Sequence, residues 1–108
     1  MEIHTIGFTK KSARQFFEAL IVEDYTRAGR LYSGMPAAKM AEVFGKFKFL
    51  RIVSIGQPRP HRDPATGFLQ VPCQVEIEAD GERSIITPTA NVRRVIGQPG
   101  RWAIGGGI

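Results

Sequence analysis

Residues 12–45 carry apolar side chains at intervals of three and four, the spacing of amphipathic helices. A first helix is predicted to begin at Ser12, because Ser12 and Gln15 have the spacing of a capping box, which satisfies two backbone N–H groups. Residues 1–8 are interpreted as a short extended lead-in to this helix. Its apolar side comprises Ala13, Phe16, Phe17, Leu20 and Ile21.

Two shorter helices are predicted to follow. Asp24 is a residue type favoured at N-caps, so a second helix is expected after it, and Gly34 interrupts that helical pattern. Pro36 suits the first position of a third helix, where its missing N–H costs nothing, and Gly45 is a typical stop. The three predicted helices therefore occupy the N-terminal part of the chain.

After Gly45 the pattern changes to β-branched and aromatic runs, which are typical of strands. Strands are predicted over residues 47–55, 68–79, 82–95 and 101–104. Residues 56–67 contain three prolines and begin and end with glycine, so they are predicted to form an exposed loop. Helices followed by strands favour an α+β fold in a single domain over residues 1–108, with the three helices packed on a curved four-stranded antiparallel sheet.

The Asp80-Gly81 pair predicts a two-residue β-hairpin turn, because both turn positions require positive φ. This turn places Ala79 opposite Glu82 and Val75 opposite Ile86. One face of the hairpin then collects the apolar residues Leu69, Val71, Cys73, Val75, Ile77, Ile86, Ala90 and Val92. The helices are expected to cover this face, with a core formed by Phe16, Phe17, Leu20, Leu31, Val71, Val75, Ile86, Val92 and Trp102.

The opposite face of the hairpin is polar and rich in threonine, asparagine and glutamine, with Ile85 among them. Side chains of this kind cost little to desolvate against a copy of themselves, so a homodimer through this sheet face is predicted. Pro88 cannot donate a ladder hydrogen bond, and the strand that contains it is expected to bend or bulge there.

Composition narrows the class of protein further. Hydrophobic residues make up 43% of the chain and charged residues 23%, which is typical of a globular domain. A formal charge of +5 permits nucleic-acid binding, but the basic residues are scattered and are interpreted mainly as solvated faces. The single cysteine excludes an internal disulfide and a cysteine-based zinc site. No apolar run approaches the ~18 residues of a membrane span, and no signal peptide is recognised.

Several segments together resemble a known superfamily. They are Ser12–Leu20 with Asp24-Tyr25, Ile52–Gly56, Val71–Cys73, Val75–Ile77 and Arg101–Ile108. As a pattern they resemble small bacterial members of the nuclear transport factor 2-like, or cystatin-like, superfamily. The resemblance implies a cone-shaped fold, a cavity between helices and sheet, and dimerisation across the outer sheet face. It implies no single activity, since the superfamily includes enzymes, transport factors and accessory domains.

The residues offer little catalytic chemistry. Enzymes of the superfamily use Asp, His or Tyr side chains in the cavity, yet the inward face of the central hairpin has neither a carboxylate nor a histidine. No catalytic residue, cofactor or metal site is therefore assigned. The candidate ligand-binding residues are Tyr25 and Tyr32 on the second helix and His61 and Asp63 in the loop. Cys73 is interpreted as a small buried hydrophobe.

These observations favour a non-catalytic domain that binds a small apolar ligand or a protein, consistent with a module of a longer protein. The first alternative is a small isomerase-like or dehydratase-like enzyme acting on an apolar substrate, with Tyr25, Tyr32, His61 or Asp63 transferring protons. The second alternative is a basic nucleic-acid-binding domain. The sequence leaves the cellular compartment open.

Overall fold

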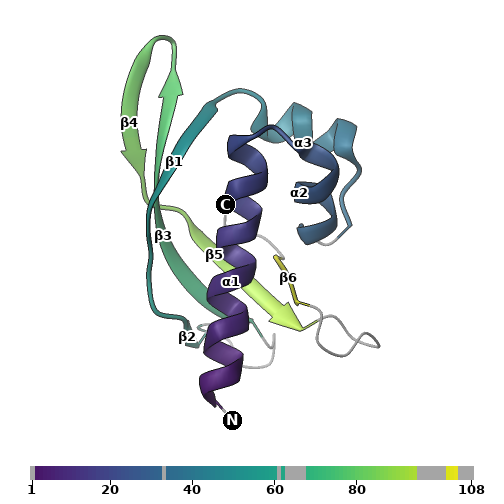
Figure 1. Cartoon of the computed structure of the whole chain (residues 1–108), viewed down its shortest axis with the longest axis vertical. Helices are drawn as coiled ribbons and strands as arrows, with labels where there is room; N and C mark the ends of the chain where they lie inside the picture. The colour runs from purple at the N-terminus through teal and green to yellow at the C-terminus, as the bar shows by residue number, and fades with distance from the viewer. Residues whose placement is uncertain (1, 33, 61, 63–67, 95–101, 105–108) are drawn as a thin grey trace.

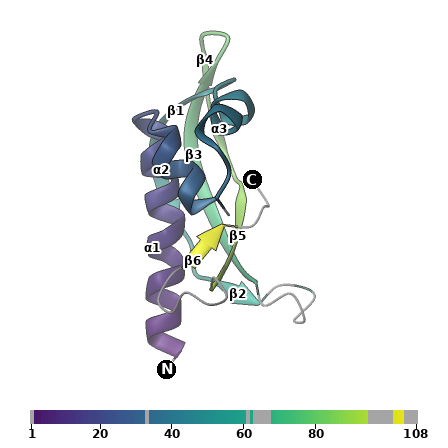
Figure 2. The same ribbon diagram turned by 90° about the vertical axis from the view of Figure 1, so that its right-hand side faces the viewer.

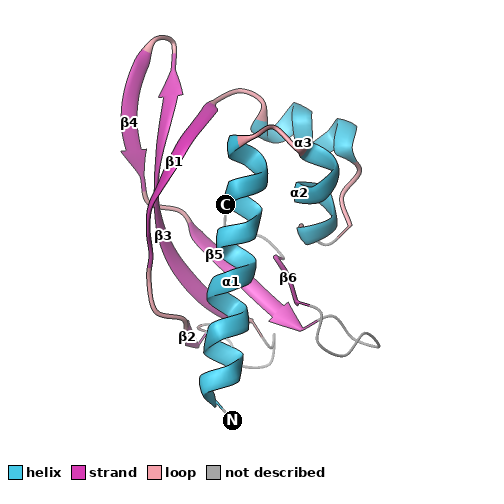
Figure 3. Cartoon of the chain, in the orientation of Figure 1, coloured by secondary structure: helices cyan, strands magenta, loops and turns pink. Residues whose placement is uncertain are grey.

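Three helices precede six strands in the computed structural model, which describes residues 2–32, 34–60, 62, 68–94 and 102–104 (Figure 1). The helices are α1 (Glu2–Ile21), α2 (Tyr25–Leu31) and α3 (Ala37–Phe44). The strands are β1 (Lys48–Ile55), β2 (Arg59–Pro60), β3 (Leu69–Ala79), β4 (Glu82–Ile86), β5 (Thr89–Arg94) and β6 (Trp102–Ile104). The predicted α+β class, with helices first and an antiparallel sheet second, is confirmed (Figure 3).

The first helix begins earlier than the sequence pattern predicted. α1 starts at Glu2, so the extended lead-in over residues 1–8 and the capping box at Ser12 are both wrong. Ser12 lies in the middle of the helix and is buried. The physical reason is that no proline interrupts the segment, and Ile6 precedes Ala13 by seven residues, the two-turn helical spacing that continues upstream of Ser12.

The two short helices follow their local signals. The Asp24 side chain caps α2, because its Oδ1 accepts a hydrogen bond from the Arg27 backbone N–H at 3.1 Å. Pro36 was predicted to be the first residue of the third helix, but it takes the N-cap position with an extended backbone, and α3 begins one residue later at Ala37. Gly45 ends α3, as predicted, and its N–H donates to the Ala41 carbonyl at 2.8 Å.

The antiparallel sheet has more strands than the four that were predicted. β3 is its centre and pairs with β1, β2, β4 and β5, and β5 pairs in turn with β6. The difference arises at two places. The predicted strand over residues 82–95 is divided into β4 and β5, and the two-residue β2 forms within the predicted loop. The cone shape expected from the superfamily stays a prediction.

The hairpin register was predicted correctly. Ala79 pairs with Glu82, Val75 with Ile86 and Leu69 with Val92, so the register is the same on both sides of Pro88. At Pro88 the strand is interrupted without an extra residue, and the Pro88 carbonyl still accepts a hydrogen bond from the Cys73 N–H at 2.9 Å. The predicted bend or bulge is therefore an interruption that divides one long strand into two.

β1 departs from simple alternation. Its register against β3 shifts between Phe49 and Arg51 and again between Ile52 and Ser54, which marks two β-bulges. Phe49 and Ile55 are consequently buried and Ile52 is half-buried, at intervals of three residues. Strict alternation would have pointed Arg51 into the core, whereas the bulges leave it exposed.

The core lies between α1 and the sheet, since α1 contacts β1, β3, β5 and β6 (Figure 2). Most of the predicted core is confirmed, and Leu31 and Ile86 are only partly buried. The side chain of Trp102 lies outside the described residues. Fully buried side chains on the two layers include Phe16, Phe17, Val71, Val75, Ala90, Val92 and Ile104.

One part of the sheet extends beyond the helices. The turn of the β3–β4 hairpin, which we call the arm (Glu78–Ile85), projects past the ends of α1 and α3 in both views (Figures 1 and 2). Residues 80–85 of the arm are exposed, and β4 packs on β3. The arm is therefore held by strand pairing and by its turn, in which Asp80 and Gly81 have φ of 53° and 80°.

Candidate functional site

The structure places the two candidate tyrosines at the edge of the core. Tyr32 packs in an aromatic cluster, with ring centroids 5.6 Å from Phe16 and 5.7 Å from Phe44. Tyr25 is half-buried and also packs against the core. Both residues therefore have a packing role in the region where α2 meets α1 and α3.

The other two candidates, His61 and Asp63, lie outside the described residues. A site that combines these loop residues with the tyrosines of α2 is consequently still a prediction. Among the described residues, no three His, Cys, Asp or Glu side chains gather as a metal site would require. No described helix is long and apolar enough to span a membrane.

Cys73 occupies the apolar face of β3, as the register predicted, and is buried. Its Sγ donates to the Val71 carbonyl at 3.3 Å. Burial raises the pKa of the thiol from 9.0 to about 11, against a smaller opposite contribution from a backbone hydrogen bond at Ala90. The thiol is thus protonated at neutral pH, which disfavours a nucleophilic role.

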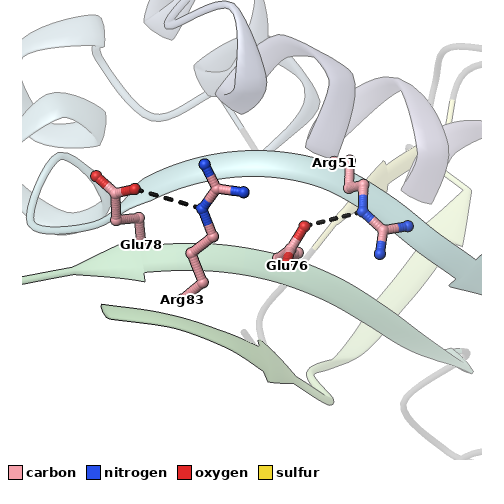
Figure 4. A network of polar contacts seen from close by, with 4 residues as sticks. All are labelled: Arg51, Glu76, Glu78 and Arg83. Carbon is pink, nitrogen blue, oxygen red and sulfur yellow. Dashed lines mark hydrogen bonds and ion pairs between the residues drawn. The ribbon is translucent and has the colours of Figure 1, made fainter. Parts of the chain in front are cut away.

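The face of the sheet that points away from α1 carries paired charges from three strands (Figure 4). Arg51 of β1 donates through Nε to Glu76 Oε1 of β3 at 2.8 Å. Arg83 Nε of β4 lies 3.7 Å from Glu78 Oε1, also of β3. We call this the outer face and define it by Arg51, Ser54, Phe68, Gln70, Gln74, Glu76, Glu78, Arg83, Ile85, Thr89, Asn91 and Arg93.

The outer face also has apolar and uncharged polar parts. Ile85 is 53% exposed and lies opposite Glu76 on the arm. Ser54 Oγ is 3.2 Å from Gln74 Oε1. The outer face thus combines paired charges with one exposed apolar side chain.

At the end of the outer face formed by β5, the surface contains an aromatic ring and an amide side chain. The Arg93 guanidinium of β5 lies 5.1 Å from the centroid of the ring of Phe68, the residue just before β3, in a cation–π arrangement. The neighbouring Asn91 Oδ1 is buried and has no hydrogen-bond partner among the described residues. An unsatisfied buried amide oxygen costs free energy, and because this oxygen is buried it is not accessible to a donor from another molecule.

Sequence reasoning missed part of this surface. It placed Ile85, Glu76 and Glu78 on the outward side correctly, because the turn determines the β3–β4 register. It did not assign Arg51 to this surface, because the two bulges of β1 leave no recognisable residue signature. The Arg51–Glu76 contact joins residues 25 positions apart, and only the β1–β3 pairing brings them together.

Comparisons with protein-family models, curated proteins and solved structures found no match to this chain. The resemblance to the nuclear transport factor 2-like superfamily is thus carried by the sequence pattern alone, and the site is interpreted from its own geometry.

Proposed function

We propose that this chain is a non-catalytic binding domain that recognises a protein partner through the outer face of its sheet. The observation that carries the proposal is the contrast between the two faces. α1 packs on the inner face, whereas the outer face of β1, β3 and β4 exposes Arg51, Arg83 and Ile85.

The composition of the outer face supports a protein rather than a highly charged ligand. Two of its three arginines, Arg51 and Arg83, each lie against a glutamate, so the charge of these two is largely compensated. Ile85 adds exposed apolar area beside these pairs, and Phe68 and Arg93 add an aromatic–cation pair. Arginine and aromatic side chains contribute strongly to protein interfaces.

The inner face supports a scaffold role. Val71, Val75, Ala90 and Val92 are fully buried there, and the neighbouring Cys73 thiol is held protonated by burial. The nuclear transport factor 2-like resemblance belongs to the same proposal, because that superfamily includes non-catalytic partner-binding domains. A homodimer through the sheet face would be one form of such binding.

The proposal is tested by comparing two matched substitutions of exposed aliphatic residues. Ile85→Arg alters the outer face, and Val22→Arg, at a residue 71% exposed after the end of α1, is the control. Immobilised wild-type protein and both variants are incubated with an extract of the producing cells. Retained polypeptides are purified, and their dissociation constants are measured by titration.

The expected result is a purified polypeptide that binds wild type and Val22→Arg equally and binds Ile85→Arg at least tenfold more weakly. Binding that is unaffected by Ile85→Arg would contradict the proposed surface. Retention that disappears after nuclease treatment would instead support the basic nucleic-acid-binding alternative, with strong salt dependence as its second mark.

A further inference from the structure

The outer edge of β4 is a free strand edge. Among the described strands β4 pairs with β3, and the described pairings leave its other edge open. Residues 82–85 are exposed, and the arm that carries them projects beyond the helices (Figures 1 and 2). Another chain can therefore approach this edge without meeting the helical layer.

The turn geometry tells which backbone groups face that edge. In a two-residue hairpin the closing pair, here Ala79 and Glu82, is hydrogen-bonded, and the pairs alternate from there. The hydrogen bond from the Cys73 N–H to the Pro88 carbonyl follows the same alternation farther along the ladder. Arg83 and Ile85 therefore turn their backbone N–H and C=O groups toward the free edge.

The free edges of the sheet differ in how well they are protected against pairing with a strand of another chain. Native proteins blunt strand edges with bulges, prolines, charged side chains or very short strands, and β4 carries two charged residues, Glu82 and Arg83. β1 has two bulges, and β6 has three residues. β4 has neither a bulge nor a proline over its five residues. Of the edges in the described part of the sheet, β4 is thus the most suited to accept another strand.

We propose that the partner at this edge is a second copy of the chain, whose β4 pairs antiparallel with the first, Ser84 opposite Ser84. In this register Arg83 lies opposite Ile85 of the second copy, and their outward backbone groups form hydrogen-bonded pairs. Across the joined outer face the side chains then run Arg51, Glu76, Ile85 and, from the second copy, Arg83 and Glu78. Positive and negative charges alternate around a central isoleucine in this row.

Neighbouring registers are less favourable. Moving the twofold axis to Arg83 would place two arginines directly opposite each other, and like charges in that position destabilise a sheet. Moving it to Ile85 would bring Pro88 opposite Glu82, at the point where the strand is interrupted. The Ser84-centred register avoids both conflicts.

This inference rests on the proposed function and adds to it, because the second copy pairs through the β4 edge and leaves the outer face free for the protein partner. Edge pairing keeps both outer faces on the same side, so the dimer presents a continuous binding surface to a further protein. It differs from the face-to-face dimer expected from the sequence, in which the two outer faces would cover each other.

The register is tested with single cysteine variants. Ser84→Cys brings two thiols opposite each other in a non-hydrogen-bonded pair, about 4.5 Å between Cα atoms, within the range of a disulfide. Oxidised glutathione accepts the two electrons and two protons of the bond that forms. The expected result is a covalent dimer of Ser84→Cys, with at least tenfold less dimer for the neighbours Arg83→Cys and Glu82→Cys. The native Cys73 is buried and does not compete.

A second measurement does not depend on disulfide formation. Sedimentation at tens of micromolar should give twice the monomer mass of 12.0 kDa for wild type. Ile85→Pro removes an N–H that faces the free edge and makes no bond to β3, so it should give monomers with unchanged circular dichroism. The matched control Ile85→Thr keeps the N–H and the β-branched shape and should remain dimeric.

A monomeric wild type, or equal cross-linking of all three cysteine variants, would overturn the inference. So would a dimer that Thr89→Arg, on the outer face, abolishes and Ile85→Pro leaves intact, because that result would mean face-to-face pairing. A monomeric wild type whose partner binding is still weakened by Ile85→Arg would overturn this inference alone. A Ser84→Cys dimer combined with partner binding that Ile85→Arg leaves unchanged would overturn the proposed function alone, so the two failures are distinguishable.

Discussion

One strand, β3, belongs to two regions with opposite properties. From Val71 to Ile77 its inward side chains are at most 5% exposed, whereas the arm formed with β4 is largely exposed. The strand register is continuous through both regions. Strand pairing therefore does not distinguish them, and the difference is the helical layer that covers only the first. This arrangement separates stability, which comes from burial, from the surface available for binding.

Truncation of buried and exposed residues should show this contrast most strongly. Leu20→Ala and Val75→Ala should each lower the free energy of unfolding by about 2–4 kcal/mol. Both side chains are buried, and each truncation leaves a cavity into which the surrounding residues relax only partially. Ile85→Ala should change it by less than about 0.5 kcal/mol, since that side chain is largely exposed. Urea denaturation of the three variants measures the difference, and equal losses at all three positions would refute the division into two regions.

The sequence allowed the hairpin and the two short helices to be predicted because their signals are local. The Asp80-Gly81 turn acts on adjacent residues, and Asp24 caps the turn that follows it. The start of α1 could not be placed in this way. Ser12 and Gln15 have the same spacing whether Ser12 lies inside a helix or caps its start, so the local pattern does not distinguish the two positions. In the structure Ser12 lies inside α1 and is buried.

The candidate site was predicted less completely than the fold. The inward and outward sides of the β3–β4 hairpin followed from one turn, including the position of Ile85. The Arg51–Glu76 pair did not, because bulges in β1 change which residues face outward and depend on long-range pairing. Of the four predicted ligand-binding residues, the structure describes Tyr25 and Tyr32 and places both against the core.

Alkaline pH should weaken the covered region through Cys73. The folded pKa, about 11, is raised above the ordinary value of 9.0. The contribution of Cys73 to the free energy of unfolding is therefore fully present below pH 9. It falls between pH 9 and 11, because in this range the thiol of the unfolded chain has lost its proton whereas the thiol of the folded chain has not. The loss should be on the order of 3 kcal/mol, since each pKa unit corresponds to about 1.4 kcal/mol.

The measurement is urea denaturation of wild type and Cys73→Ala at intervals from pH 8 upward. Cys73→Ala leaves a cavity and should be less stable than wild type at pH 8, and this difference should shrink as the pH rises, so the difference in slope is the informative quantity. Parallel pH profiles of the two proteins would contradict a buried thiol with a raised pKa.

We expect the stability of the arm to depend more on the backbone conformation of its turn than on its exposed side chains. Gly81 has φ of 80° with open space around it, so Gly81→Ala meets no steric neighbour but must adopt a left-handed backbone. Its cost should be about 1 kcal/mol. Gly81→Asn is the matched control and should cost less, because asparagine tolerates this conformation. Thermal unfolding compares them, and equal effects of both substitutions would argue against this backbone origin.

The smallest expected effects distinguish two ion pairs within the outer face. Arg51 and Glu76 are 2.8 Å apart and Glu76 is 20% exposed, whereas Arg83 and Glu78 are 3.7 Å apart and Glu78 is 36% exposed. A double-mutant cycle to alanine should give a coupling of about 0.5 kcal/mol for the first pair and less for the second, because solvent screens exposed pairs. Raising the salt concentration should reduce both couplings. If the more exposed pair on the arm coupled more strongly, the arm would contribute to stability through electrostatics, and exposure alone would no longer explain the difference between the two regions.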